Sequence, residues 1–279
     1  MGWTERQQAM LQEMGLRLWL PAPAVLPADA APLAAQAAAP LEPEPAVALA
    51  PAPPRPATTA APAATPAPAP APVLPHRDTS AVATMDWPAL RSAVAGCRAC
   101  GLCDSRRQTV FGVGHPQAHC MVVGEAPGEQ EDAQGEPFVG AAGQLLDRML
   151  AALGLGRGAD PQAATPARQV FIANTLKCRP PRNRNPAPQE LAACQPFLER
   201  QVALVQPRVI LAMGRFAVQQ LLGSDAPIGK LRGTVHQWRG VPLVVTYHPA
   251  YLLRQPADKA KAWDDLCLAA NLLAQPGGR

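Results

Sequence analysis

The sequence predicts an α/β domain in which a mostly parallel sheet is covered by helices on both faces. The first observation is that four short apolar runs alternate with segments whose apolar residues have helical spacing. Strands that alternate with helices form parallel sheets with both faces buried. The second observation is a change of composition near residue 85, which separates this domain from a long proline-rich segment.

The proline-rich segment occupies much of the first third of the 279-residue chain. Of 34 prolines, 17 lie between Pro21 and Pro75, mixed with alanine. Such a segment buries too little apolar surface to offset chain entropy, so we expect a disordered linker over residues 21–84. Residues 1–84 carry 4 basic and 6 acidic side chains, which leaves 21 basic and 15 acidic side chains in residues 85–279. The folded part is therefore the basic part, which suits a polyanionic partner.

The elements of the domain follow from apolar spacing and from helix-end signals. A proline at the first helical position marks the helix that starts at Pro188, and Gly154 marks the end of another. The expected helices are residues 87–97, 143–154, 188–205, 215–223 and 259–273. The expected strands lie in residues 120–128, 170–174, 209–214 and 242–254, the first ending in a Gly–Pro loop and the last in a polar turn.

Polar or glycine residues stand where each expected strand ends. They are the Gly124–Pro127 segment, Asn174, Gly214 and His248. Because the carboxyl ends of parallel strands meet at one edge of a sheet, sites form in the crevice beyond that edge. The sequence therefore predicts a functional site built from these four strand ends.

Four cysteines carry a second signal: the close pair Cys97 and Cys100, then the distant Cys178 and Cys194. Thiolates are soft ligands, and the spacing alone fits zinc as well as an iron–sulfur cluster. Cys103 lies in the same segment and is treated as a spare thiol. Seven cysteines, an odd number, argue against a secreted disulfide framework. With no apolar run of membrane-spanning length and no signal architecture, we expect a cytoplasmic protein without membrane contact.

Four motifs in order give the chain a specific resemblance. They are CRACGLCDSRRQTVFG, GEAPGEQEDAQGEPFVGAAGQLLDRML, NTLKCRPPRNRNPAPQE followed by Cys194, and HPAYLLR. From about Cys97 to Leu273 the chain resembles the family 4 uracil-DNA glycosylases, the iron–sulfur branch of that superfamily. The resemblance implies a three-layer α/β/α sandwich with a central, mostly parallel four-stranded sheet. It also implies a four-iron four-sulfur cluster on Cys97, Cys100, Cys178 and Cys194.

The reaction that the resemblance implies is hydrolysis of the N-glycosidic bond of uracil in DNA, which leaves an abasic site without a lyase step. An enzyme that attacks a base takes it out of the stack and holds it in a pocket. Phe138 would supply an aromatic face for that base, although it could also be a core residue. The amide of Asn174 would accept from uracil N3–H and donate to O4, a pattern that cytosine reverses. The alternative for Asn174 is a cap of the following turn.

His248 is the expected electrophile, because breaking the bond leaves negative charge on uracil O2 and a donor aimed there stabilises it. The alternative is a histidine that only supports its loop. The usual water-activating aspartate is absent, since Ala126 stands where the better-known branch of the superfamily has that residue. Our hypothesis is that Glu125 orients water or supports the oxocarbenium charge, with help from Glu131. Solvation or a helix start would explain either carboxylate equally well. Backbone N–H groups from Gly124 onward could bind a phosphate or the uracil carbonyl.

Contacts to DNA are expected from two segments. Leu252 stands where the family has a wedge that fills the space left by the flipped base, with Arg254 near phosphate. The loop pinned by the cluster would bring basic side chains to phosphates, among them Lys177, Arg182 and Arg184. The alternatives are a core leucine and a solvated charged surface. One relative of the family binds its substrate covalently through a histidine in an inserted loop, which KLRGTVH does not match, so we expect free turnover.

The N-terminal segment differs from the linker behind it. Residues 4–20 place apolar residues on one possible helical face and weakly resemble the N-terminal peptide of the psi subunit of bacterial replicative polymerase, which binds the clamp loader. The alternative is a helix that folds back on the domain. We therefore expect three parts: a docking segment (1–20), the linker (21–84) and the glycosylase domain (85–279), in a monomer associated with the nucleoid. The rival functions are a non-catalytic iron–sulfur nucleic-acid-binding module, which Ala126 favours, and a zinc-stabilised domain.

Overall fold

The computed structural model describes residues 10, 13, 79–158 and 165–275. The predicted linker and docking segment therefore lie outside the described residues, except at three points. Thr79–Thr84 form helix α2, inside the range predicted as linker, because Val82 is buried against the domain. Met10 is also buried, in the core cluster on one face of the sheet. The third point is Glu13, which is helical and exposed.

The sheet contains the four predicted strands and two that were not predicted. In spatial order it runs β1-β3-β2-β4-β6-β5. The four inner strands are parallel to one another, and the two edge strands pair antiparallel. The strands are β1 (Val113–Gly114), β2 (Cys120–Gly124), β3 (Val170–Asn174), β4 (Val209–Met213), β5 (Val235–Trp238) and β6 (Val241–Thr246).

The predicted helices are present with small shifts of their ends. Asp86 Oδ1 accepts from Ala89 N at 2.9 Å and so fixes the start of the helix after it. The α-helices are α2, α3 (Trp87–Ala95), α4 (Glu129–Gln134), α5 (Ala141–Ala152), α6 (Pro188–Val205), α7 (Arg215–Leu222), α8 (Ile228–Leu231), α9 (Pro249–Arg254) and α10 (Lys259–Ala274). The 3-10 turns are η1 (Gly101–Asp104), η2 (Pro166–Arg168), η3 (Pro181–Asn183) and η4 (Pro256–Asp258).

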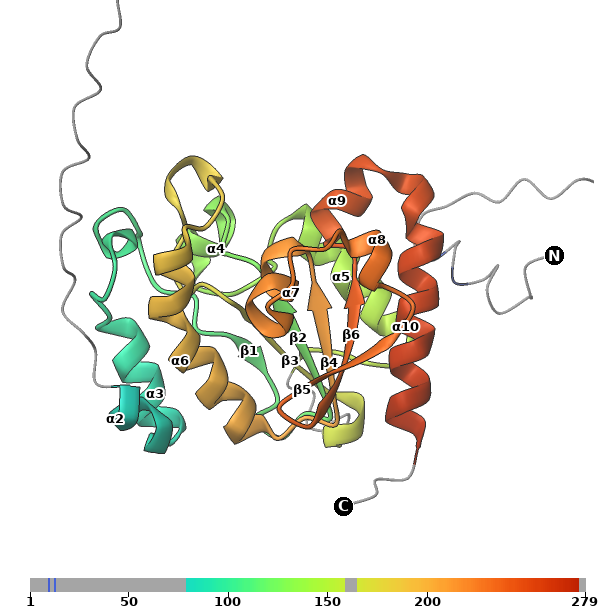
Figure 1. The fold of residues 1–279 in the computed structure, drawn as a ribbon, viewed down its shortest axis with the longest axis horizontal. Helices are drawn as coiled ribbons and strands as arrows, with labels where there is room; N and C mark the ends of the chain where they lie inside the picture. The colour runs from blue at the N-terminus through green and yellow to red at the C-terminus, as the bar shows by residue number, and fades with distance from the viewer. Residues whose placement is uncertain (1–9, 11–12, 14–78, 159–164, 276–279) are drawn as a thin grey trace, which may run out of the picture. The chain divides into compact units, whose positions relative to one another are not determined.

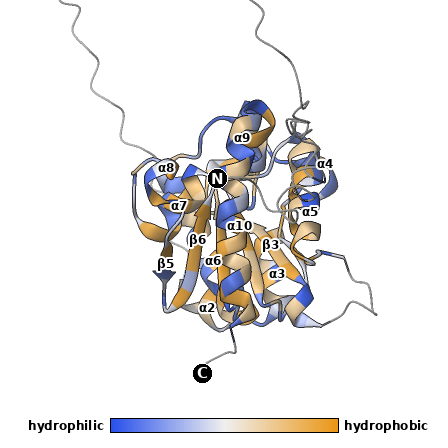
Figure 2. Cartoon of the chain, turned by 90° about the vertical axis from the view of Figure 1, so that its right-hand side faces the viewer, coloured by the Kyte–Doolittle hydropathy of each residue, from blue (hydrophilic) through white to orange (hydrophobic). Residues whose placement is uncertain are grey.

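Successive residues of each inner strand point into two different cores. Val122 and Ile172 belong to the cluster that packs with helices α5 and α10, whereas Met121 and Phe171 belong to the cluster that packs with α3 and α6. The sheet therefore lies between two helical layers (Figure 1), which confirms the predicted α/β/α sandwich. Seen from the side in Figure 2, β3 and β6 are mostly hydrophobic, whereas the edge strand β5 and the helix α10 carry hydrophilic stretches. Within the described part of the chain, no helix has the length and hydropathy needed to cross a membrane.

Candidate active site

The site lies at the edge of the sheet where the inner strands end. Asn174 is the last residue of β3 and pairs in register with Gly124, the last residue of β2. On the other side, Gly214 N donates to Thr246 O at 3.2 Å and joins the ends of β4 and β6. Because the inner strands are parallel, their carboxyl ends lie side by side, and the segments predicted to form the site follow these ends.

Asn174 and Phe138 meet over Gly124. A Cβ atom on Gly124 would lie 2.4 Å from Asn174 Oδ1 and 2.6 Å from Phe138 Cζ, so only glycine permits this close approach. Asn174 is 2% exposed, and its Oδ1 has no hydrogen-bond partner among the described residues. A buried acceptor without a donor is rare in native proteins and points to a ligand that supplies one.

Phe138 brings an aromatic ring to the same place. Its ring stacks on the imidazole of His248 with the centroids 5.3 Å apart and an angle of 26° between the planes. The backbone of Phe138 is in the left-handed region, with φ of 55°, which residues with a side chain rarely adopt. Three side chains predicted from distant motifs are therefore brought together: Phe138, Asn174 and His248.

His248 is held in one tautomer. It precedes α9, and its Nδ1 accepts from Ala250 N at 3.2 Å, which leaves the ring proton on Nε2. Burial lowers the pKa of His248 to about 4, and Arg254 lowers it further while Glu131 opposes the change. At neutral pH the imidazole is therefore uncharged and keeps one N–H donor.

Glu125 follows β2 and is anchored by the start of α7. Its Oε1 accepts from Phe216 N at 3.0 Å, and a Cβ on Gly214 would lie only 2.5 Å from the same oxygen. Burial raises the pKa of Glu125, while the backbone N–H groups of Phe216 and Arg215 lower it. The carboxylate is thus fixed in orientation by a helix N-terminus.

Glu131 is engaged by backbone groups on both sides of a loop. Its Oε2 accepts from Gly128 N at 3.0 Å, and its Oε1 accepts from Val139 N at 3.0 Å and from Gly140 N at 3.3 Å. These contacts close the loop between α4 and α5, which carries Phe138. Glu131 therefore fixes the shape of the loop. Among the described residues, no hydrogen bond joins Glu131 to Glu125. Ala126, predicted at the substrate, packs against the cysteine-containing cluster.

The four predicted ligand cysteines lie close together and are buried. Cys100, Cys178 and Cys194 share one apolar cluster, and Cys97 is buried beside it in the neighbouring core. Burial raises the pKa of the Cys178 thiol, and the charges of Cys100 and Cys97 add to this effect, whereas a hydrogen bond from Arg106 Nη1 to Cys178 Sγ, 3.1 Å long, opposes it.

Four buried thiols from three segments match an iron–sulfur cluster in number and in chemistry. No three histidine, cysteine or acidic side chains of the described residues are arranged as the ligands of a bound metal ion.

Two predicted DNA contacts are wrong. Leu252 is fully buried in the core, because Pro249 and Leu252 form the inner face of α9. Its neighbour Leu253 is 44% exposed and is the apolar side chain that this helix presents to solvent. Lys177 is 1% exposed; its Nζ donates to Asn174 O and to Gln201 Oε1, both at 2.7 Å. Lys177 therefore supports the backbone at Asn174 from inside the domain and does not reach a phosphate.

The remaining predicted cations are at the surface. Arg182 and Arg254 are exposed. Arg184 forms a two-bonded ion pair with Glu190, at 2.6 and 2.9 Å, which also stabilises the start of α6. Its guanidinium is thus partly neutralised, whereas Arg182 and Arg254 keep their charge toward solvent.

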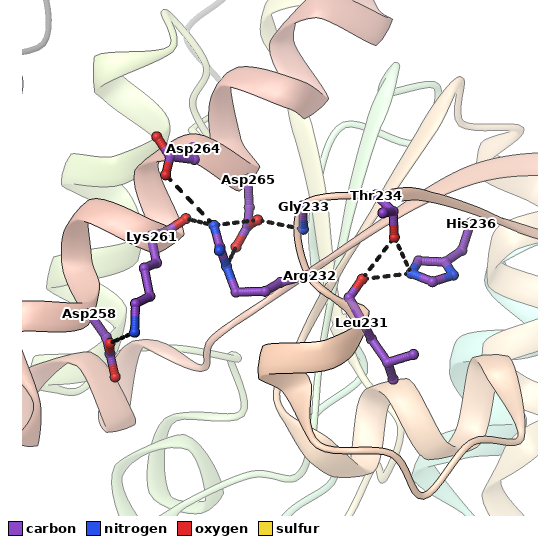
Figure 3. A network of polar contacts seen from close by, with 9 residues as sticks. All are labelled: Leu231, Arg232, Gly233, Thr234, His236, Asp258, Lys261, Asp264 and Asp265. Carbon is purple, nitrogen blue, oxygen red and sulfur yellow. Dashed lines mark hydrogen bonds and ion pairs between the residues drawn. The ribbon is translucent and has the colours of Figure 1, made fainter. Parts of the chain in front are cut away.

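The KLRGTVH segment is fixed by α10 (Figure 3). Arg232 Nε donates to Asp265 Oδ2 at 3.0 Å, and Gly233 N donates to Asp265 Oδ1 at 3.0 Å. His236 Nε2 lies 2.7 Å from Leu231 O within its own loop. The histidine of this segment is therefore part of a structural network. A surface hollow of about 1280 Å³ lies at the other edge of the sheet, before β2 and β4, and contains none of the predicted site residues.

The chain is similar to known proteins over most of this domain. Residues 111–267 match the family model described as the uracil DNA glycosylase superfamily. The chain is 41% identical over 192 residues to a type-4 uracil-DNA glycosylase of Pyrobaculum aerophilum, covering 66% of this chain and 93% of that protein. It is 41% identical over 188 residues to a type-4 uracil-DNA glycosylase of Thermotoga maritima, with the same two shares of 66% and 93%. With a type-5 uracil-DNA glycosylase of Thermus thermophilus the identity is 32% over 153 residues, or 50% of this chain and 68% of that protein.

Proposed function

The chain belongs to the uracil DNA glycosylase superfamily as a uracil-DNA glycosylase of type 4, and from this premise we propose how its residues recognise and release uracil. In this proposal the uracil nucleotide leaves the DNA stack and the base enters the space bounded by Gly124, Phe138, Asn174 and His248. Hydrolysis of the N-glycosidic bond then leaves an abasic site. A non-catalytic binding module is not retained, because the relatives are enzymes.

The buried and unpaired Oδ1 of Asn174 is the observation that carries the proposal. A buried acceptor without a donor costs about 1–3 kcal/mol, and uracil N3–H would relieve that cost. Cytosine has no hydrogen at N3, so it would leave the oxygen unpaired and add a second acceptor beside it. Sites that match a polar group in this way discriminate strongly against a base that lacks it.

Neutral His248 acts on the leaving group. As the glycosidic bond breaks, negative charge gathers on uracil O2, and the Nε2–H of His248 donates to that oxygen. Because the bond from Ala250 N fixes the ring and burial keeps it uncharged, the donor is in place before the reaction starts. Preorganised donors of this kind contribute roughly 10²–10³ to the rate. Phe138, stacked on the same imidazole, offers the aromatic surface for the base.

Glu125 supports the other half of the reaction. A carboxylate held at a helix N-terminus next to Gly124 is available to orient the attacking water or to stabilise positive charge on the sugar. Glu131 contributes by holding the loop of Phe138. Contacts with DNA come from Arg182 and Arg254 at phosphates and from Leu253 as the wedge.

A four-iron four-sulfur cluster completes the domain in this proposal. Cys97, Cys100, Cys178 and Cys194 would hold it, and when bound it would cross-link the segment after Asn174 to α3 and α6. The measurement is iron and sulfide content with the visible absorbance of anaerobically purified protein, against a Cys178→Ser variant. A colourless protein that holds zinc would contradict the assignment.

A repair glycosylase acts where the genome is, so we propose a cytoplasmic, nucleoid-associated monomer. A clamp-loader contact through residues 4–20 would bring it to the replication fork. Burial of Met10 in the domain core opposes that contact, and a peptide of residues 1–22 that retains no clamp-loader component in a pull-down would end the idea.

The base-recognition proposal is tested by binding of free uracil. Uracil is expected to raise the melting temperature of the wild type, and the rise should follow the logarithm of the uracil concentration once that concentration exceeds the Kd. Cytosine is not expected to raise it, and Asn174→Ala is expected to abolish the effect of uracil. Asn271→Ala, which removes an exposed amide on α10, is the matched control. Equal stabilisation of the Asn174→Ala variant by uracil would contradict the assignment of Asn174.

A further inference from the structure

The loop that carries Phe138 is held by a side chain that none of the sequence motifs points to. Phe138 has φ of 55°, and a residue with a side chain keeps this conformation only where its surroundings fix it. Strain of this kind collects at ligand clamps and active sites.

Arg157 holds two backbone carbonyl groups of this loop. It follows helix α5, four residues after the cap residue Leu153. Its Nη1 donates to Pro137 O at 2.7 Å and its Nη2 donates to Phe138 O at 3.0 Å. The guanidinium is itself oriented by Asp147, whose Oδ1 accepts from Nε at 2.7 Å. The planar fork of arginine suits two parallel carbonyl groups, which a lysine cannot match.

The amide groups of the same loop are held from the other direction. Glu131 Oε1 accepts from Val139 N and from Gly140 N. Gly143 completes the arrangement, because a Cβ at this position would lie 1.7 Å from Phe138 O. Four consecutive residues, 137–140, therefore have their backbone fixed by one guanidinium and one carboxylate.

We propose that Arg157 is a positioning residue for uracil recognition, which sets the ring of Phe138 against Asn174 and His248. This inference rests on the proposed contact of Phe138 with the base. A plain surface ion pair between Arg157 and Asp147 would be the structural alternative. Exposed ion pairs contribute little, however, and the side chain of Arg157 is only 16% exposed, with two of its donors on the loop backbone.

A double-mutant cycle on single-turnover uracil release tests the proposal. Arg157→Met removes the donors and keeps the aliphatic stem, and we expect a loss of about 10- to 100-fold, because small misplacements at a reacting centre have effects of this size. Arg157→Lys is expected to recover part of the rate. Arg168→Met, which removes an exposed arginine of η2, is the matched control and is expected to keep the wild-type rate.

The decisive comparison is made in the Phe138→Ala background. If Arg157 acts by placing the ring, Arg157→Met adds little once the ring is gone. Equal losses in both backgrounds would overturn the inference and leave a general stabilising role. A Phe138→Ala variant with the wild-type rate would instead remove the proposed role of Phe138. Should Arg157→Met fail to fold, as circular dichroism would show, the same cycle is run with Arg157→Lys.

Discussion

Replacing His248 by asparagine is expected to change the pH dependence of stability by a calculable amount. Burial lowers the pKa of His248 from 6.5 to about 4 in the folded protein. The unfolded chain therefore binds a proton at His248 more readily than the folded protein does. Stability is unaffected by this group above pH 6.5 and decreases as the pH falls from 6.5 toward 4.

The magnitude follows from the linkage relation. The full difference between the two pKa values corresponds to roughly 3 kcal/mol of unfolding free energy, an upper bound because the side chain is only partly buried. Between pH 7.5 and pH 5.5 the expected loss is about 1.3 kcal/mol. Asparagine is the replacement of choice, because its side-chain oxygen can still accept from Ala250 N at the start of α9.

The assay is urea unfolding of the wild type and of His248→Asn at pH 7.5 and pH 5.5. All other titratable groups are common to both proteins, so their contributions cancel in the difference. We expect the wild type to lose about 1.3 kcal/mol more than the variant on going to pH 5.5. Equal losses would show that His248 is not kept neutral by its surroundings, and the argument for a neutral donor at uracil O2 would fail.

Three further predictions concern single substitutions. Gly124→Ala places a methyl group 2.4 Å from Asn174 Oδ1 and is expected to lower uracil release at least tenfold while circular dichroism stays unchanged; near-normal release would show that Gly124 does not bound the base pocket. Glu125→Gln keeps the shape and removes the charge, so single-turnover release is expected to fall by about 10²-fold, and a near-normal rate would remove Glu125 from the mechanism. Leu252→Ala is expected to cost about 2–5 kcal/mol of stability by urea unfolding. Leu253→Ala should leave stability within about 0.5 kcal/mol and weaken binding of uracil-containing duplex. The reverse pattern would restore Leu252 as the wedge.

The strands and the residues at their ends could be predicted from the sequence. Parallel strands bring their carboxyl ends to one edge of the sheet, so the sequence predicts that Gly124, Asn174 and His248 lie together. The edge strands were missed, because β1 has only two residues and β5 has four residues, none of them buried, with polar His236 and Gln237 at its centre. Short edge pairings of this kind depend on the neighbouring strand more than on their own sequence.

Side-chain direction was where sequence reasoning was wrong. Leu252 and Leu253 are adjacent and chemically identical, and only the helical phase of α9 decides which one faces solvent. That segment was expected to be a strand followed by a turn, so no phase was available. Lys177 lies in a run of basic residues, which predicts exposure. Its hydrogen-bond partner Gln201 is on α6, 24 positions later, so the local sequence does not predict this bond. Arg157 was missed for the same reason.

The most direct test of the account is single-turnover release of uracil from an oligonucleotide by the wild type, Asn174→Ala and the control Asn271→Ala. The account predicts that the wild type and Asn271→Ala release uracil at similar rates and leave cytosine untouched. We expect Asn174→Ala to lose the rate by about 10²-fold or more, because the buried acceptor proposed for uracil N3–H is gone. An Asn174→Ala variant that releases uracil at the wild-type rate, and still ignores cytosine, would contradict it.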